Sequence, residues 1–82
     1  MKIKYFAWIK DITNIEEEEI NLNKAKNLEE LKAYLIEKYP DFKKHIIKEI
    51  FRFAINQEYV VVKNTNLNDE DEIAIFPPVS GG

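Results

Sequence analysis

Residues 72–82 read Glu-Ile-Ala-Ile-Phe-Pro-Pro-Val-Ser-Gly-Gly, and this C-terminal stretch decides the fold. In a strand, successive side chains of its first five residues would point to opposite faces, which puts Ile73 and Ile75 on the same face. This pattern predicts a strand with one face in the core. The two prolines that follow at once fix φ near −65° and favour an extended exit from that strand. We therefore expect a folded domain at residues 1–76 and a flexible, extended tail at residues 77–82.

The tail has the composition of a chain end that is fed into another protein. Terminal glycines taken alone are more often a disordered stub or an expression scar. Here they follow closely on a strand and two prolines, with only Val79 and Ser80 between. Glycine has no side chain, so a channel too narrow for any other residue admits it. The terminal carboxylate of Gly82 would then be the reactive group, presented by Pro77, Pro78, Val79, Ser80 and Gly81.

The composition excludes most catalytic and metal sites. The 82 residues, 45% hydrophobic and 33% charged, are typical of one small globular domain. Because the chain has no cysteine and one histidine, we expect no disulfide, no metal site and no enzyme activity of its own. The net charge of −3 argues against a nucleic-acid binder. Without a run of ~20 apolar residues or a signal-peptide core, we expect a cytoplasmic protein with no membrane partner.

Residues 2–10 have the period of two that predicts a first strand. Its core side would carry Ile3, Tyr5, Ala7 and Ile9. Its other side carries Phe6 and Trp8 among lysines, where a solvated strand would have only polar groups. Two interpretations stay open for these rings: they pack under a loop or over the strand edge, or they form a partner surface.

A turn is expected at residues 11–14, followed by a second strand at residues 15–22. The middle of this strand, residues 16–19, is a run of four glutamates. Such a run is usually a solvated edge that discourages aggregation between sheets. We assign it no catalytic role, because nothing in the sequence supplies the apolar pocket that would raise a carboxyl pKa.

A helix follows, with Asn27 as its N-cap and Glu30 three residues later, close to a capping box. Its apolar stripe consists of Leu28, Leu31, Leu35 and Tyr39, broadened by Tyr34. Pro40 ends the helix at or before Tyr39. One apolar stripe predicts that this helix lies across one face of the sheet.

Residues 41–50 are compatible with a short second helix or with a loop held by apolar anchors. His45 lies within them, and we interpret it as structural rather than catalytic. Residues 51–55 alternate again, residues 56–58 form a tight turn, and residues 59–62 return as a strand. Residues 63–71 are polar and predict a connection over the surface.

This order of elements predicts an α+β fold of the ubiquitin-like β-grasp type, a mixed sheet of four to five strands with one main helix packed across it. The first and last strands would lie side by side at its centre. Residues 69–82, residues 54–57 (Ala-Ile-Asn-Gln) and residues 3–7 (Ile-Lys-Tyr-Phe-Ala) also resemble the small subunit of molybdopterin synthase, the MoaD family. The resemblance covers essentially the whole chain.

The resemblance implies a sulfur carrier with no bound cofactor. An E1-like activating enzyme would consume ATP to adenylate the Gly82 carboxylate, and sulfur would displace AMP to give a thiocarboxylate. The carrier would then donate this sulfur to cyclic pyranopterin monophosphate in the active site of the large synthase subunit, with which it would form a heterotetramer. The resemblance also implies that Phe6, Tyr59 and Phe76 contact these partners.

Two alternatives remain open. A sulfur carrier of another pathway, such as thiamine synthesis, would use the same fold, the same Gly-Gly end and the same activation. A ubiquitin-like protein modifier would instead join Gly82 to lysines. The Phe-Pro-Pro sequence at residues 76–78 favours the molybdopterin interpretation over a carrier of another pathway. The modifier is distinguished by whether the Gly82 acyl group ends on sulfur or on protein amines.

Overall fold

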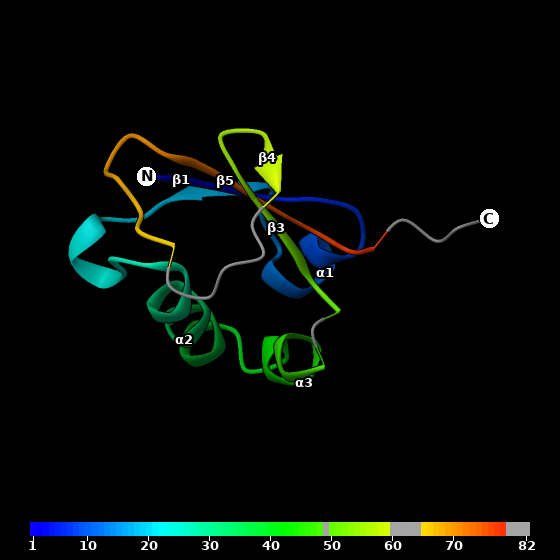
Figure 1. Cartoon of the computed structure of the whole chain (residues 1–82). Helices are drawn as coiled ribbons and strands as arrows, with labels where there is room; N and C mark the ends of the chain where they lie inside the picture. The colour runs from blue at the N-terminus through cyan, green and yellow to red at the C-terminus, as the bar shows by residue number, and fades with distance from the viewer. Residues whose placement is uncertain (49, 60–64, 79–82) are drawn as a thin grey trace.

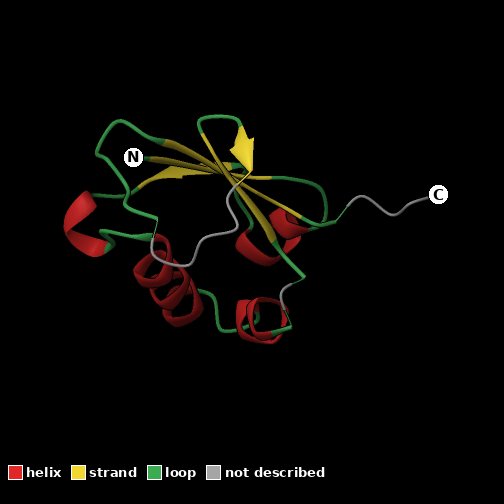
Figure 2. Ribbon diagram, viewed as in Figure 1, coloured by secondary structure: helices red, strands yellow, loops and turns green. Residues whose placement is uncertain are grey.

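The structure is a computed structural model that describes residues 1–48, 50–59 and 65–78 (Figure 1 and Figure 2). Its elements along the chain are β1 Lys2–Tyr5, α1 Ile9–Thr13, β2 Glu17–Glu19, a 3₁₀ helix η1 Leu22–Lys24, α2 Leu28–Lys38, α3 Phe42–Ile47, β3 Arg52–Ile55, β4 Glu58–Tyr59 and β5 Glu72–Phe76. In this part of the chain no helix combines the length and the hydropathy needed to cross a membrane.

One mixed sheet of five strands organises the molecule, in the order β2-β1-β5-β3-β4. The first strand pairs in parallel with the last, with Ile3 opposite Ile73 and Tyr5 opposite Ile75. The other pairings are antiparallel. The predicted placement of the first and last strands at the centre is therefore confirmed, and β5 runs from residue 72 to residue 76 as expected.

The helix α2 lies across one face of the sheet and covers the core (Figure 1). The Asn27 Oδ1 atom accepts from the Glu30 amide at 2.8 Å, which confirms the predicted N-cap. The Glu30 carboxylate accepts from the amide of Lys26 at 3.0 Å, one residue earlier than in a capping box. The helix is held by its apolar stripe, and the residues buried between helix and sheet include Leu28, Leu31, Leu35, Ile3, Tyr5, Phe53, Ile73 and Ile75.

The prediction that the first strand continues to residue 10 was wrong. The strand ends at Tyr5, because Ala7 takes a positive φ of 55° and turns the chain out of the sheet. The helix α1 then replaces the rest of the predicted strand and the predicted turn at residues 11–14. Ile9 is buried as expected, but from this helix, whereas Ala7 is exposed and does not belong to the core.

The second strand is shorter than predicted, and one residue of its acidic run is not solvated. The register places Glu18 opposite Ile3, on the core side of β2. Its side chain is only 10% exposed, and it accepts hydrogen bonds from the phenols of Tyr5 and Tyr39 and from the Lys38 ammonium. Burial alone would raise the pKa of Glu18, but the hydrogen bonds from Lys38, Tyr39 and Tyr5 outweigh it and hold the pKa below its ordinary value.

Residues 41–50 contain the helix α3, which decides between the two open interpretations in favour of a helix. The hairpin β3–β4 is confirmed, and its turn is tighter than predicted. Only two residues form it, Asn56 at φ 52° and Gln57 at φ 72°, and the second strand starts at Glu58. Residues 60–62 of the predicted strand lie outside the described residues.

The connection before β5 does not lie wholly on the surface as predicted. Leu67 and Asp71 are buried. The Asp71 carboxylate accepts from the Asn68 amide at 2.7 Å and from the Asn56 side chain at 2.8 Å. The Asn56 Oδ1 atom in turn accepts from the Glu72 amide at 3.0 Å. These hydrogen bonds tie the hairpin turn to the start of β5, which fixes the strand that leads to the tail.

Candidate functional site

The sheet face opposite α2, here named the outer face, is not covered by any helix of the described residues (Figure 1). Side chains of β5 alternate, so Ile73 and Ile75 enter the core while Ala74 and Phe76 face outward. Phe6 continues the ladder beyond β1, since its amide donates to the Ile75 carbonyl at 3.0 Å. Phe6 and Phe76 therefore both lie on the outer face, at the end where β5 leads into the tail.

Three rings gather on the outer face and form the aromatic patch, defined as Phe6, Tyr59 and Phe76. Tyr59 is 74% exposed and Phe6 45% exposed. The rings of Tyr59 and Phe76 meet edge to face, with centroids 5.6 Å apart. The strand register puts Ala54 of β3 opposite both Tyr59 and Ala74, and Arg52 of β3 opposite Phe76. The three predicted partner-binding residues thus share one exposed surface.

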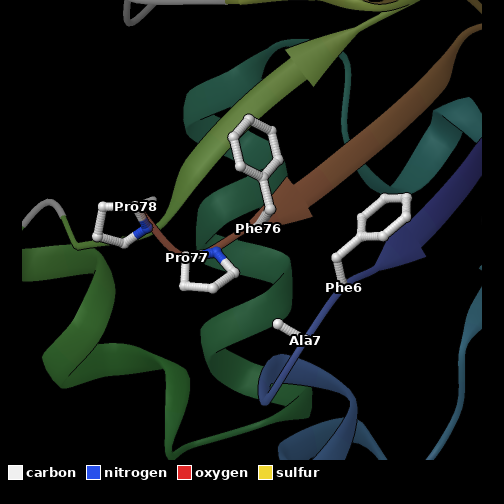
Figure 3. A pocket seen from close by; sticks show the side chains of 5 residues that line it. All are labelled: Phe6, Ala7, Phe76, Pro77 and Pro78. Atoms are coloured by element: carbon white, nitrogen blue, oxygen red, sulfur yellow. The ribbon is translucent and has the colours of Figure 1, made fainter. Parts of the chain in front are cut away.

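A hollow of about 460 Å³ opens beside this patch and is lined by Phe6, Ala7, Phe76, Pro77 and Pro78. Phe6 and Phe76 point to the same side of the sheet, and the two prolines border the hollow where β5 ends (Figure 3). All five lining side chains are apolar, so none of them can donate or accept a proton. The hollow is suited to receive an apolar side chain, not to perform acid–base chemistry.

Charged side chains lie on the part of the outer face that is remote from the hollow. Lys4 pairs with Glu72 at 3.3 Å and Lys2 pairs with Glu17 at 3.3 Å. The first pair links β1 to the start of β5, and the second links β1 to β2. The apolar part of the outer face is therefore the end from which the tail leaves.

Trp8 has a different environment from Phe6. Its ring lies 5.0 Å from His45 and 5.6 Å from Phe51, centroid to centroid, so it packs on α3 and remains 40% exposed. The packing interpretation left open for these rings applies to Trp8, and the partner-surface interpretation of Phe6 stays a prediction. Trp8 packs on the edge of the fold, and Phe6 lines the hollow.

His45 has the structural environment that the sequence suggested. Its ring stacks on Phe51 at 5.0 Å, and its Nδ1 atom is buried without a hydrogen-bond partner. Burial, and after it the nearby Lys44 charge, lowers the pKa of His45 below its ordinary value. Among the described residues no group of His, Cys, Asp and Glu is arranged to hold a metal ion.

The tail itself is described only at its root. Pro77 is partly buried and Pro78 is exposed. Val79, Ser80, Gly81 and Gly82 lie outside the described residues. Ala7 is the lining residue that sequence reasoning missed, because the predicted strand placed it in the core and no sequence signal announced its positive φ.

The sequence comparisons identify relatives over the whole chain. The family model described as "ThiS family" matches residues 3–82. The molybdopterin synthase sulfur carrier subunit of Chlamydomonas reinhardtii is 35% identical over 83 aligned positions, which cover 100% of this chain and 98% of the relative.

Solved structures share the same fold. A Pyrococcus furiosus protein described as molybdopterin converting factor subunit 1 superposes with a TM-score of 0.82 at 28% identity, covering 95% of each chain. A chain from the complex of subunits 1 and 2 of the molybdopterin-converting factor from Helicobacter pylori gives 0.71 at 31% identity, covering 99% of this chain and 96% of the other.

The small archaeal modifier protein 1 of Methanosarcina acetivorans has the same fold as well, with a TM-score of 0.76 at 26% identity over 99% of this chain and 94% of its own. The family match extends over residues 3–82, and the alignment with the Chlamydomonas relative covers the whole chain. Both therefore include the β-grasp sheet and the C-terminal sequence. The chain therefore belongs to the ThiS family, among the small sulfur-carrier subunits of molybdopterin synthase.

Proposed function

We propose that this chain carries sulfur on Gly82 for molybdenum cofactor biosynthesis, as the small subunit of a molybdopterin synthase. The observation that carries the proposal is the exposed apolar hollow at the root of the tail, between Phe6 and Phe76 on one side and Pro77 and Pro78 on the other. An exposed apolar surface of this kind marks a binding site. Its position means that a protein docked there also receives the tail.

The chemistry proceeds in two steps on the terminal carboxylate. A carboxylate oxygen of Gly82 attacks the α-phosphate of ATP on an E1-like activating enzyme, which forms the acyl-adenylate and releases pyrophosphate. Sulfur at the oxidation level of hydrosulfide then attacks the acyl carbon and displaces AMP, which leaves a thiocarboxylate on Gly82. The activating enzyme supplies the ATP site, and the carrier supplies only its chain end.

The thiocarboxylate then enters the active site of the large subunit and gives its sulfur to cyclic pyranopterin monophosphate. Two such deliveries build the dithiolene of molybdopterin. The small protein is a cosubstrate rather than an enzyme, because the hollow at its tail is lined by apolar side chains alone. We propose a heterotetramer with the large subunit and, since the first step consumes ATP, a cytoplasmic location.

A ubiquitin-like modifier is the second candidate function. It is favoured by the likeness to the small archaeal modifier protein 1. The two functions differ in the atom to which the Gly82 acyl group is transferred. In the carrier it passes to sulfur, and in the modifier it passes to lysine amines of other proteins. A carrier for thiamine synthesis would differ only in the final acceptor.

The test is a reconstitution with the activating enzyme and the large subunit of the same organism. Intact mass of the purified chain after incubation with ATP and a sulfur source is expected to show the thiocarboxylate. A chemically prepared Gly82 thiocarboxylate is expected to support one round of transfer per carrier once the large subunit is present, and none without it. Repeated turnover by the small protein alone, or attachment to many lysines without sulfur transfer, would contradict the proposal.

A further inference from the structure

Ala7, which lines the hollow, has a backbone conformation that is uncommon for alanine. Its φ is 55°, and the next residue, Trp8, has a φ of −70° and a ψ of −10°. The Ile9 amide donates to the Phe6 carbonyl at 3.2 Å, which closes a four-residue turn. A positive φ followed by a negative one is the pattern of a type II′ turn, whose first central residue is usually glycine, asparagine or aspartate. An alanine there is strained, because its Cβ atom crowds the neighbouring backbone.

Ala7 differs from the other residues that have a positive φ. The described residues with this conformation are Ala7, Asn14, Asn56 and Gln57. Two of them are asparagine, which tolerates a positive φ, and Gln57 belongs to the hairpin turn. Of these four residues only Ala7 lines the hollow. A strained residue that persists at a candidate binding surface points to a role in that surface.

The Ala7 side chain forms part of the wall of the hollow. In Figure 3 its methyl group is directed toward the side on which Pro77 lies, and Phe6 and Phe76 stand on the other sides. Ala7 is exposed, so a larger side chain would extend into the hollow without displacing the core. Glycine would relieve the strain but remove this part of the wall, and asparagine would relieve it but place an amide group in the hollow. Alanine keeps the wall apolar and small, at a cost in backbone strain.

We infer that Ala7 is a specificity-determining residue for docking of the large synthase subunit, because its methyl group leaves the room that an apolar side chain of that subunit occupies. The inference rests on the proposed function, since it takes the recipient of the tail as the occupant. The hollow borders the root of the tail at Pro77 and Pro78, so a protein that receives the tail is adjacent to it. Apolar walls exclude a polar side chain, whose groups would lose water without gaining a partner.

The test compares Ala7→Asn with Ala7→Gly in the full chain. Both residues suit a positive φ, so neither variant is expected to lower the urea midpoint of the free chain. They differ in what reaches the hollow, because asparagine fills it and glycine widens it. In calorimetric titration with the large subunit, Ala7→Asn is expected to weaken binding about tenfold, and Ala7→Gly by much less.

Sulfur transfer gives a readout that a purely structural role would not change. A chemically prepared Gly82 thiocarboxylate is mixed with the large subunit, and the single-turnover rate is followed against carrier concentration. Ala7→Asn is expected to raise the concentration at half-maximal rate far more than it lowers the maximal rate, because it weakens docking and leaves the reacting chain end unaltered. Ala7→Asp, which also suits a positive φ and fills the same space, repeats the test with a second side chain and is expected to give the same result.

Asn14→Ala is the control, because it places alanine at another position of positive φ, 64°, that does not line the hollow. It is expected to lower the urea midpoint and to keep full affinity. Full affinity of the folded Ala7→Asn and Ala7→Asp variants would overturn the inference, and so would an equal loss in Ala7→Gly. In either case sulfur transfer by the unmodified chain leaves the proposed function standing, whereas no transfer by the unmodified thiocarboxylate would contradict the proposed function itself.

Discussion

The rings of Tyr59 and Phe76 meet edge to face on the outer face of the sheet, with centroids 5.6 Å apart. Tyr59 comes from a hairpin strand of two residues at the edge, and Phe76 is the last residue of the central strand. The contact therefore links the edge of the sheet to the point where the tail begins. It also holds the Phe76 ring on the outer face of the sheet.

Replacing Phe76 with alanine is expected to weaken partner binding more than it lowers the melting temperature. The ring lines the exposed hollow instead of the core, and aromatic residues at the centre of an interface commonly contribute about 2 kcal/mol or more. Calorimetric titration with the large subunit and thermal unfolding of the free chain measure the two effects.

Tyr34→Ala is the matched control for Phe76→Ala, because Tyr34 is a partly buried ring of α2 that packs against the core on the other side of the sheet. We expect this variant to lower the melting temperature and to keep its affinity for the partner. A Phe76 variant with full affinity would remove the aromatic patch from the interface.

Deleting Gly82 is expected to abolish sulfur loading and to leave the fold unchanged. The deletion shifts the terminal carboxylate by one residue, which withdraws it from a channel built for a glycine backbone. Intact mass after incubation with ATP, the activating enzyme and a sulfur source reports the loading. Ser80→Ala, which keeps the length and both glycines, is expected to load normally, and a normal thiocarboxylate on the shortened chain would contradict this role.

Stability is expected to fall with acid partly through Glu18. Its pKa is lower in the folded than in the unfolded chain, so ionised Glu18 stabilises the fold above its ordinary pKa of 4.5, and this stabilisation is lost as the pH falls through the folded value. Glu18→Gln is expected to lower the free energy of unfolding by on the order of 1 to 3 kcal/mol at pH 7. It is also expected to make the free energy of unfolding depend less on pH.

Urea unfolding between pH 7 and pH 3 measures this effect. Glu16→Gln changes the same charge at a side chain that is 84% exposed, and it is expected to leave the profile close to that of the unmodified chain. If both variants have the same profile, the hydrogen bonds to Tyr5, Tyr39 and Lys38 do not control the acid response.

The hairpin turn offers a stabilising substitution. Gln57 has a φ of 72°, a conformation that glycine adopts without strain, and Asn-Gly is the preferred sequence for a two-residue turn of this kind. Gln57→Gly is expected to stabilise the chain by about 0.5 to 1 kcal/mol. The urea midpoint checks this, with Gln57→Ala as the control that keeps a Cβ atom and brings no gain.

The elements that follow a strong local pattern were predictable from the sequence. Strand β5 and helix α2 combine a clear period with a stop signal, Pro77 and Pro40 respectively, so local rules determine where they end. The parity of β5 also placed Phe76 on the outer face correctly. The partner-binding roles of Phe6, Tyr59 and Phe76 stay predictions.

Features that depend on tertiary contacts were not predictable in the same way. The positive φ of Ala7 ends the first strand early, and alanine gives no sequence signal for it. Glu18 is one of four glutamates in a row, and only the register with β1 selects it to receive two phenols and an ammonium group. Local charge pattern cannot identify which carboxylate of such a run lies inside.

The central position of β5 determines how the domain responds to a pulling force. Under the proposed function, a partner that drew the tail into its active site would apply tension to β5 along its axis. Because β5 is bonded to β1 on one edge and to β3 on the other, this tension loads both ladders at once in shear, instead of peeling the strand away one hydrogen bond at a time. The sheet therefore holds the root of the tail from both edges of β5.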